Sequence, residues 1–174
     1  MIVKEINTFL KFSSFFQPDQ EMLKWIVDYA AGRPIIDCGC GNGNVTKSLR
    51  KAGQGPIIAM DIMTDCTDLL RASIGDPKGL IQFLPHDCSI SNIVKMKNCL
   101  LLFCRPSHNI ATKYKGSWVE STINNMDSSS EALYITLQSN LIKYSDLGEY
   151  EESAIKLKHS GSSVDSEIVI SVKK

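Results

Sequence analysis

The sequence lacks a long apolar run, an excess of one charge and a signal-like leader. Its longest apolar stretch runs from Cys99 to Cys104, far shorter than the roughly 20 residues that span a bilayer. The 19 basic residues balance the 19 acidic ones, so the composition does not point to a nucleic acid or an anionic membrane. The first residues contain Glu5 and no apolar core of signal-peptide length. We therefore expect a soluble, cytoplasmic protein with no membrane contact.

The sequence also lacks the cysteine spacing of a zinc site. Cys38 and Cys40 are separated by one residue, where a zinc knuckle has two, and no histidine stands at ligand spacing from a cysteine. We therefore expect no metal site. A chain of 174 residues can build one core without disulfide bonds, and most of its cysteines lie in or beside apolar runs, which favours reduced thiols.

Short apolar runs alternate with helical patterns along most of the chain. The runs predict buried strands, and the patterns between them predict covering helices. This alternation is typical of a doubly wound, Rossmann-like α/β domain with a mostly parallel sheet. The predicted strands cover residues 34–38, 56–60, 80–84, 99–104 and 132–137, and the predicted helices cover residues 18–31, 44–52, 64–73, 91–97 and 117–125.

The last part of the chain has a different pattern. Apolar and polar residues alternate over residues 155–158 and again over 168–172, with a Gly-Ser-Ser turn region between them. We interpret this pattern as a C-terminal antiparallel hairpin, which brings the sheet to seven strands. Residues 1–17 fit no clear pattern. We therefore divide the chain into this N-terminal segment, a possible lid or substrate-side element, and a domain of residues 18–174.

A glycine-rich turn, Asp37-Cys38-Gly39-Cys40-Gly41-Asn42-Gly43, follows the first strand of the alternating region and precedes a helix. Glycines permit a sharp turn and let a ligand approach the backbone closely, and amides at a helix start suit anionic oxygens. Asp61 ends the next predicted strand, where a carboxylate can accept hydrogen bonds from two ribose hydroxyls. In such folds ligands bind at the carboxyl ends of the strands. The turn and Asp61 therefore predict a cofactor site.

These features resemble the class I S-adenosylmethionine-dependent methyltransferases. The family's first motif is an acid followed by three glycines at alternate positions, and residues 37–43 fill every position. The strand count and the closing hairpin also resemble the family's seven-stranded sheet. The resemblance covers about residues 18–174 and implies S-adenosylmethionine as the cofactor.

The resemblance also implies roles for individual residues. Asp37 is implied to face the methionine amino group, Asp61 to hold the ribose, and Asp87, just beyond the third of these strands, to meet the adenine amino group. The predicted cofactor-binding set is Asp37, Cys38, Gly39, Gly41, Gly43, Asp61, Ile62, Asp87 and Cys88. A nicotinamide cofactor is a weaker interpretation, because its Gly-x-Gly-x-x-Gly fingerprint meets Asn44 at the last position.

The sequence lacks the motifs that identify a methyl acceptor. After the strand at residues 99–104 there is neither the Asn/Asp-Pro-Pro-aromatic tetrapeptide of base-amine methylation nor the Pro-Cys pair of cytosine-carbon methylation. Arg105 could bind an acidic group of the acceptor and His108 could act as a base, although each could also be an ordinary surface residue. Trp118 and the phenylalanines of residues 1–17 could line a substrate pocket, form a lid or lie in the core.

The predicted function is methyl transfer by direct displacement from S-adenosylmethionine. A small molecule or a protein is favoured as the acceptor over a nucleic acid, because the only basic and aromatic cluster near the site, Lys113-Tyr114-Lys115, is small. The alternative is a methyltransferase-like binding protein or partner subunit without catalysis. The sequence does not predict an oligomeric state.

Overall fold

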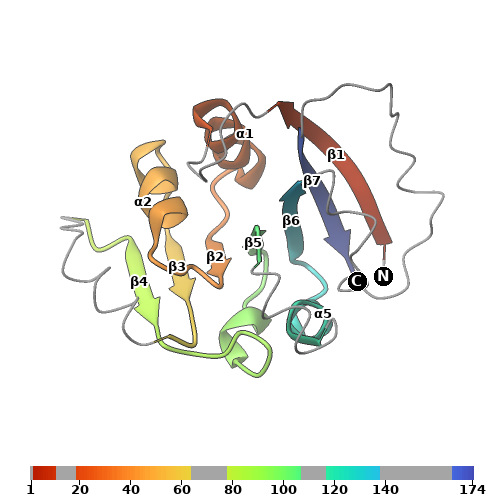
Figure 1. Cartoon of the computed structure of the whole chain (residues 1–174). Helices are drawn as coiled ribbons and strands as arrows, with labels where there is room; N and C mark the ends of the chain where they lie inside the picture. The colour runs from red at the N-terminus through yellow and green to blue at the C-terminus, as the bar shows by residue number, and fades with distance from the viewer. Residues whose placement is uncertain (1, 11–18, 64–77, 107–116, 138–165) are drawn as a thin grey trace.

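The computed structural model describes residues 2–10, 19–63, 78–106, 117–137 and 166–174 of the chain. In this part, seven strands form one sheet in the order β1-β7-β6-β5-β2-β3-β4, with helices on both sides (Figure 1). The strands are β1 (Ile2–Leu10), β2 (Ile35–Cys38), β3 (Ile57–Met60), β4 (Ile81–Leu84), β5 (Leu100–Cys104), β6 (Glu131–Leu137) and β7 (Ser166–Lys173). The helices are α1 (Gln20–Ala30), α2 (Asn44–Lys51), the 3₁₀-helix η1 (Asn92–Lys95) and α5 (Ser117–Asn125).

The order of the parallel strands reverses beside β2. This strand pairs in parallel with β3 on one side and with β5 on the other. In turn, β3 pairs with β4 and β5 pairs with β6, also in parallel. The chain therefore first builds outward from β2 and then crosses back to build in the other direction. The carboxyl ends of β2 and β5 face the crevice where ligands bind in doubly wound folds.

Alternating side chains of the strands pack into two separate cores. Leu100 and Leu102 of β5 face the core under α1 and α2, whereas Leu101 and Phe103 face the core under η1 and α5. All four side chains are fully buried. A strand with apolar residues on both faces needs helices on both sides, and the predicted three-layer α/β architecture follows from this pattern.

Helix α1 is set by local signals in the sequence. The Asp19 side chain accepts a hydrogen bond of 2.7 Å from the backbone N–H of Glu21 and so caps the helix. Met22, Ile26 and Ala30 recur at a spacing of four and are buried against the sheet. Together with α2, helix α1 covers one face of the sheet. None of the described helices is long and apolar enough to cross a membrane.

The predicted mostly parallel seven-stranded sheet is confirmed. Five predicted strands occur within one residue of their expected bounds, as do α2 and α5, and the helix expected over 91–97 is the shorter η1. The antiparallel orientation of the last strand is also confirmed, because β7 runs antiparallel to β6. The helix expected over 64–73 and the strand expected over 155–158 lie outside the described residues.

The seventh strand comes from a part of the chain where we predicted none. Residues 2–10 form β1, which pairs antiparallel with β7 along its whole length, while β6 occupies the other side of β7 (Figure 1). The antiparallel partners of β7 in the described part of the chain are therefore β6 and β1. A bulge between Glu5 and Asn7 puts Val3 and Phe9 on opposite faces of the sheet. The bulge breaks the period-2 pattern by which a strand is recognised.

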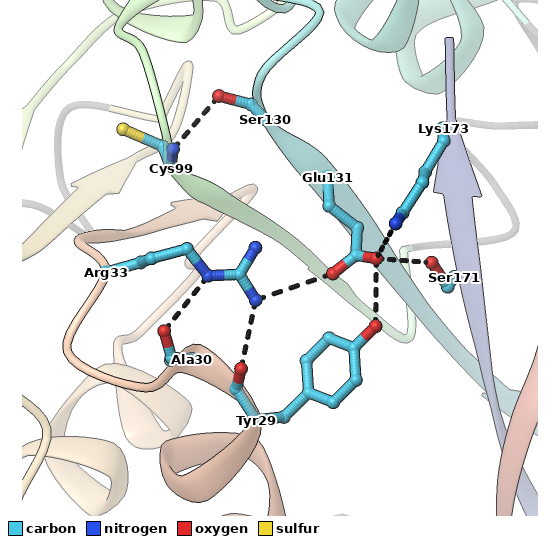
Figure 2. A network of polar contacts seen from close by, with 8 residues as sticks. All are labelled: Tyr29, Ala30, Arg33, Cys99, Ser130, Glu131, Ser171 and Lys173. Atoms are coloured by element: carbon cyan, nitrogen blue, oxygen red, sulfur yellow. Dashed lines mark hydrogen bonds and ion pairs between the residues drawn. The ribbon is translucent and has the colours of Figure 1, made fainter.

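A buried carboxylate ties α1 to the strands β6 and β7. Glu131, at the amino end of β6, accepts hydrogen bonds of 2.8 Å from the Tyr29 hydroxyl and from the Ser171 hydroxyl (Figure 2). Arg33 lies 3.5 Å and Lys173 3.4 Å from its oxygens. Burial works to raise the pKa of Glu131, but these donors and cations together hold it below its ordinary value. We call these five residues the Glu131 network.

Candidate cofactor-binding site

The glycine-rich turn is fastened to the carboxyl end of β3. The backbone N–H groups of Gly39 and Cys40 both donate to the carbonyl of Met60, at 2.8 and 2.9 Å. The N–H of Gly41 donates to the Asp61 carboxylate at 2.8 Å. The turn therefore has a defined shape and lies at the switch point of the sheet, as predicted.

The turn requires glycine at Gly39 for two reasons. Its φ is +74°, in the left-handed region that side chains rarely adopt. A Cβ there would also lie 3.2 Å from a ring carbon of Trp118, which is too close for ordinary packing. Gly41 has a φ of +53°, and no described residue lies within 4 Å of its Cβ position. The turn is therefore packed against α5 at Gly39, whereas at Gly41 none of the described residues packs on it.

Asp37 lies one residue before the end of β2, and its side chain is enclosed. The carboxylate is 2% exposed and accepts a hydrogen bond of 2.5 Å from the Thr46 hydroxyl of α2. Burial raises the pKa of Asp37 to about 6, the Thr46 hydrogen bond lowers it, and the nearby charge of Asp61 adds to the increase. Burial therefore destabilises the ionised form of Asp37 relative to a carboxylate in water, and a cation beside it would offset this effect.

Asp61 lies directly after β3 and is only partly buried. Its two oxygens accept hydrogen bonds from the backbone N–H of Gly41, at 2.8 Å, and of Met63, at 2.9 Å. Each carboxylate oxygen can accept two hydrogen bonds, so capacity remains for further donors. The backbone bonds aim this carboxylate at the glycine turn, which suits it to hold a pair of hydroxyl groups.

Asp87 stands in the loop after β4. Its carboxylate accepts hydrogen bonds from the Ser89 backbone N–H, at 2.9 Å, and from the Ser89 hydroxyl, at 2.6 Å. The carbonyl of Ser89 in turn accepts a hydrogen bond of 2.7 Å from the Asn125 side chain of α5. The loop that presents Asp87 is therefore anchored to the helix on the η1 side of the sheet.

The two cysteines of the predicted set have buried side chains. Cys38 is 2% and Cys88 4% exposed, and both belong to the core under α5. Burial and a hydrogen bond with the Cys88 thiol raise the pKa of Cys38 well above its ordinary value. Their contact brings the Asp87 loop next to the glycine turn. All five described cysteines are free thiols, and no group of three or more His, Cys, Asp or Glu residues in the described ranges could hold a metal ion.

Large apolar side chains are exposed beside the acidic residues. Ile62, which was predicted to contact the cofactor, is 61% exposed, Met63 is 54% exposed, and Ile90 is 79% exposed. Ile62 and Met63 directly follow Asp61, and Ile90 lies three residues beyond Asp87. Exposed apolar side chains at the carboxyl ends of β3 and β4 offer a surface for a flat apolar ring.

The segment after β5, where the sequence predicted contacts with a methyl acceptor, belongs only in part to the described residues. Arg105 follows β5 with a φ of +46°, and its guanidinium lies 2.5 Å from the carboxylate of Glu167, which is fully buried on β7. Its charge is thus balanced within the protein. Glu167 is not among the predicted site residues, because only the sheet order brings β7 near the end of β5. His108 lies outside the described residues.

Comparisons with known proteins give a consistent answer at the level of the fold. A TehB-like SAM-dependent methyltransferase from Corynebacterium glutamicum matches with a TM-score of 0.57 and 17% identity, over 87% of this chain and 87% of that one. The N-methyltransferase NodS from Bradyrhizobium japonicum matches with a TM-score of 0.54 and 8% identity, over 88% and 93%. Human N-acetylserotonin methyltransferase, solved in complex with SAM, matches with a TM-score of 0.57 and 13% identity, over 88% and 51%.

No protein-family model matches the sequence, and no curated protein matches it either. The similarity is therefore visible in three dimensions and not in the sequence as a whole. It agrees with the motif at residues 37–43, whose turn occupies the switch point of the sheet. The chain has the fold of the class I S-adenosylmethionine-dependent methyltransferases.

Proposed function

We propose that this protein is an S-adenosylmethionine-dependent methyltransferase that acts by direct displacement. The observation that carries the proposal is that Asp37, Asp61 and Asp87 lie at or beyond the carboxyl ends of three neighbouring strands, beside a glycine turn with no described residue within 4 Å of the Gly41 Cβ position. S-adenosylmethionine would supply an activated methyl group on a sulfonium. The protein's contribution would be to position it, and positioning alone can lower a barrier by roughly 7–11 kcal/mol.

The residues fit the chemical groups of this cofactor. Asp61 has acceptor capacity for the ribose hydroxyls, and exposed Ile62 and Met63 beside it could cover the adenine ring. Asp87 could meet the adenine amino group. The burial that raises the pKa of Asp37 destabilises its ionised form, and a cofactor ammonium beside it would stabilise that form. Backbone N–H groups of the turn and of the start of α2 suit the carboxylate.

The acceptor side carries less information. We propose a small molecule or a protein as the acceptor, with Arg105 and His108 as residues that would face it. Since Arg105 is already paired with Glu167, an acidic acceptor group would have to share it. We also propose a cytoplasmic location, because the five described cysteines are free thiols, which persist in a reducing compartment.

Calorimetric titration with S-adenosylmethionine and S-adenosylhomocysteine tests the proposal. We expect both to bind, and we expect Asp61→Ala to weaken binding by about 1–3 kcal/mol, because ribose hydroxyls would lose their acceptor. Asp28→Ala is the matched control, since Asp28 is an exposed carboxylate on α1. No heat from either nucleoside at concentrations well above micromolar would overturn the proposal. Binding without consumption of S-adenosylmethionine in cell extracts would instead support a non-catalytic partner subunit.

A further inference from the structure

Thr46 is the hydrogen-bond partner of the buried Asp37 carboxylate and has no role in the function proposed above. It lies in the first turn of α2 and is fully buried. Its hydroxyl donates to Oδ2 of Asp37 at 2.5 Å. Hydroxyl-to-carboxylate bonds of about 2.5–2.7 Å are charge-assisted and stronger than bonds between neutral groups. The bond therefore joins the end of β2 to the start of α2.

The same bond closes the base of the glycine turn. Asp37 and Thr46 stand on either side of residues 39–43, which contain three glycines. Glycine has the greatest backbone freedom of any residue, so a turn of this composition keeps its shape only through its contacts. Gly43 occupies the N-cap position of α2 and has no side chain to cap the helix. The Thr46 hydroxyl therefore fixes the helix start after the turn as well as the acid before it.

The surroundings of Asp37 give this hydroxyl an electrostatic role as well. Asp61, after β3, is the charged group that acts on Asp37 from the neighbouring strand, and like burial it raises the pKa of Asp37. The Cys38 thiol next to Asp37 is neutral, because its own pKa is raised well above the ordinary value. The Thr46 hydrogen bond acts in the opposite direction and lowers the pKa of Asp37. Of the described groups that act on this carboxylate, the hydroxyl is the one that favours its ionised form.

We propose that Thr46 is a positioning residue of the cofactor site, whose hydroxyl holds the Asp37 carboxylate and the start of α2 in the arrangement that the nucleoside binds. This inference rests on the proposed function, in which a cofactor ammonium lies beside Asp37. Thr46 acts through Asp37 and the backbone of α2 and needs no contact with the ligand. Loss of the hydroxyl lowers the population of the binding-competent turn, and the apparent affinity falls by the same factor.

Valine and serine separate the hydroxyl of Thr46 from its volume. Thr46→Val keeps the branched shape and removes the donor, so S-adenosylhomocysteine binding, measured by calorimetry at about pH 7.5, should weaken roughly tenfold. Thr46→Ser keeps the donor and loses one methyl group, so its affinity should stay within about threefold of the unmodified protein.

Thr122→Val is the matched control for the loss of a buried threonine hydroxyl. Thr122 is fully buried on α5, and its hydroxyl donates within its own helix, to the Trp118 carbonyl at 2.6 Å. Because this bond does not involve Asp37 or α2, Thr122→Val should change the affinity for S-adenosylhomocysteine by less than about twofold.

The pH dependence distinguishes this role from a loss of packing alone. Because the hydroxyl favours ionised Asp37, the loss of affinity in Thr46→Val should be larger at about pH 6 than at about pH 7.5. In an Asp37→Asn background the carboxylate charge is absent, so the added change Thr46→Val should weaken binding by less than about threefold.

Thermal unfolding verifies that each variant is folded. If Thr46→Val is unstable, Thr46→Cys takes its place, because cysteine has nearly the shape of serine but is only a weak donor. Thr46→Cys should then bind S-adenosylhomocysteine more weakly than Thr46→Ser does.

The other outcomes separate the two proposals. Equal weakening by Thr46→Ser and by the variant without a strong donor would overturn the role of the hydroxyl. A loss of affinity that is the same at both pH values, or that persists in full beside Asp37→Asn, would do the same. In these cases the cofactor site would stand, because the unmodified protein still binds. Failure of the unmodified protein to bind S-adenosylmethionine or S-adenosylhomocysteine would overturn the proposed function together with this inference.

Discussion

Glu131 at the amino end of β6 and Asp37 near the carboxyl end of β2 are both buried carboxylates, 5% and 2% exposed. Glu131 has two hydroxyl donors and two cations around it (Figure 2), and its pKa is lowered. Asp37 has one hydroxyl donor and a neighbouring acid, and its pKa is raised to about 6. The Glu131 carboxylate therefore has both hydrogen-bond donors and cations within the protein, whereas Asp37 has no cation beside it among the described residues.

The difference shows that the two carboxylates serve different purposes. A satisfied buried charge stabilises the fold by holding several elements together, here α1, β6 and β7. A buried acid without a cation is costly in the free protein, and such costs are concentrated where a ligand removes them. The two carboxylates should therefore respond in opposite ways to mutation and to pH.

The largest effect is expected from Glu131→Ala. It removes the shared acceptor of Tyr29 and Ser171 and leaves Arg33 without its carboxylate, so it should lower the free energy of unfolding by about 3 kcal/mol. Chemical denaturation at pH 7 measures this. Tyr29→Phe, which removes a single donor, should cost only about 1 kcal/mol. Equal losses for the two variants would show that the network does not act through the carboxylate.

Asp37→Asn should change the free energy of unfolding in the opposite direction. The folded pKa of about 6 lies above the ordinary value of 3.8, so the folded chain keeps a proton that the unfolded chain has lost between about pH 4 and 6. Stability therefore falls as pH rises through this window, and the neutral variant avoids the loss. We expect Asp37→Asn to be about 2 kcal/mol more stable than the unmodified protein at pH 8 and equally stable at pH 4.

Denaturation curves at several pH values measure this difference, and a constant gap between the two proteins would contradict the assignment.

For Glu131 the pKa is lowered below its ordinary value of 4.5. Its contribution is therefore present above that pH and is lost as pH falls through the folded pKa. The destabilisation caused by Glu131→Ala should therefore shrink in acid. The stabilisation caused by Asp37→Asn should shrink in acid as well, so the two variants approach the unmodified protein from opposite directions.

The smallest effect separates two glycines of the turn that differ in packing. Gly39→Ala and Gly41→Ala both force a side chain into the left-handed region, at about 1–2 kcal/mol each. Only Gly39→Ala also meets the Trp118 ring, so it should cost about 1 kcal/mol more. Thermal unfolding of the pair measures the difference. Equal costs would show that the Trp118 ring moves aside without loss of stability and does not pack firmly against the turn.

Much of the candidate site could be predicted from short stretches of sequence. The positions of Asp37, Asp61 and Asp87 follow from where apolar strands end, and the turn follows from its glycines. The partners of these residues could not be predicted in the same way. Thr46 on α2 and Glu167 on β7 meet their partners only after the elements have packed, since neither lies in a motif.

Local sequence patterns were enough to predict the alternation of strands and helices, the glycine turn and the acids near the strand ends. These features depend on side-chain periodicity and on backbone preferences within a few residues. Three contacts became visible only in the folded chain: β1 completes the sheet beside β7, Tyr29 reaches Glu131 across 102 positions, and Trp118 lies on Gly39. The reason is physical: pairing and packing are set by burial and by hydrogen-bond satisfaction over the whole fold, and no local pattern carries that information.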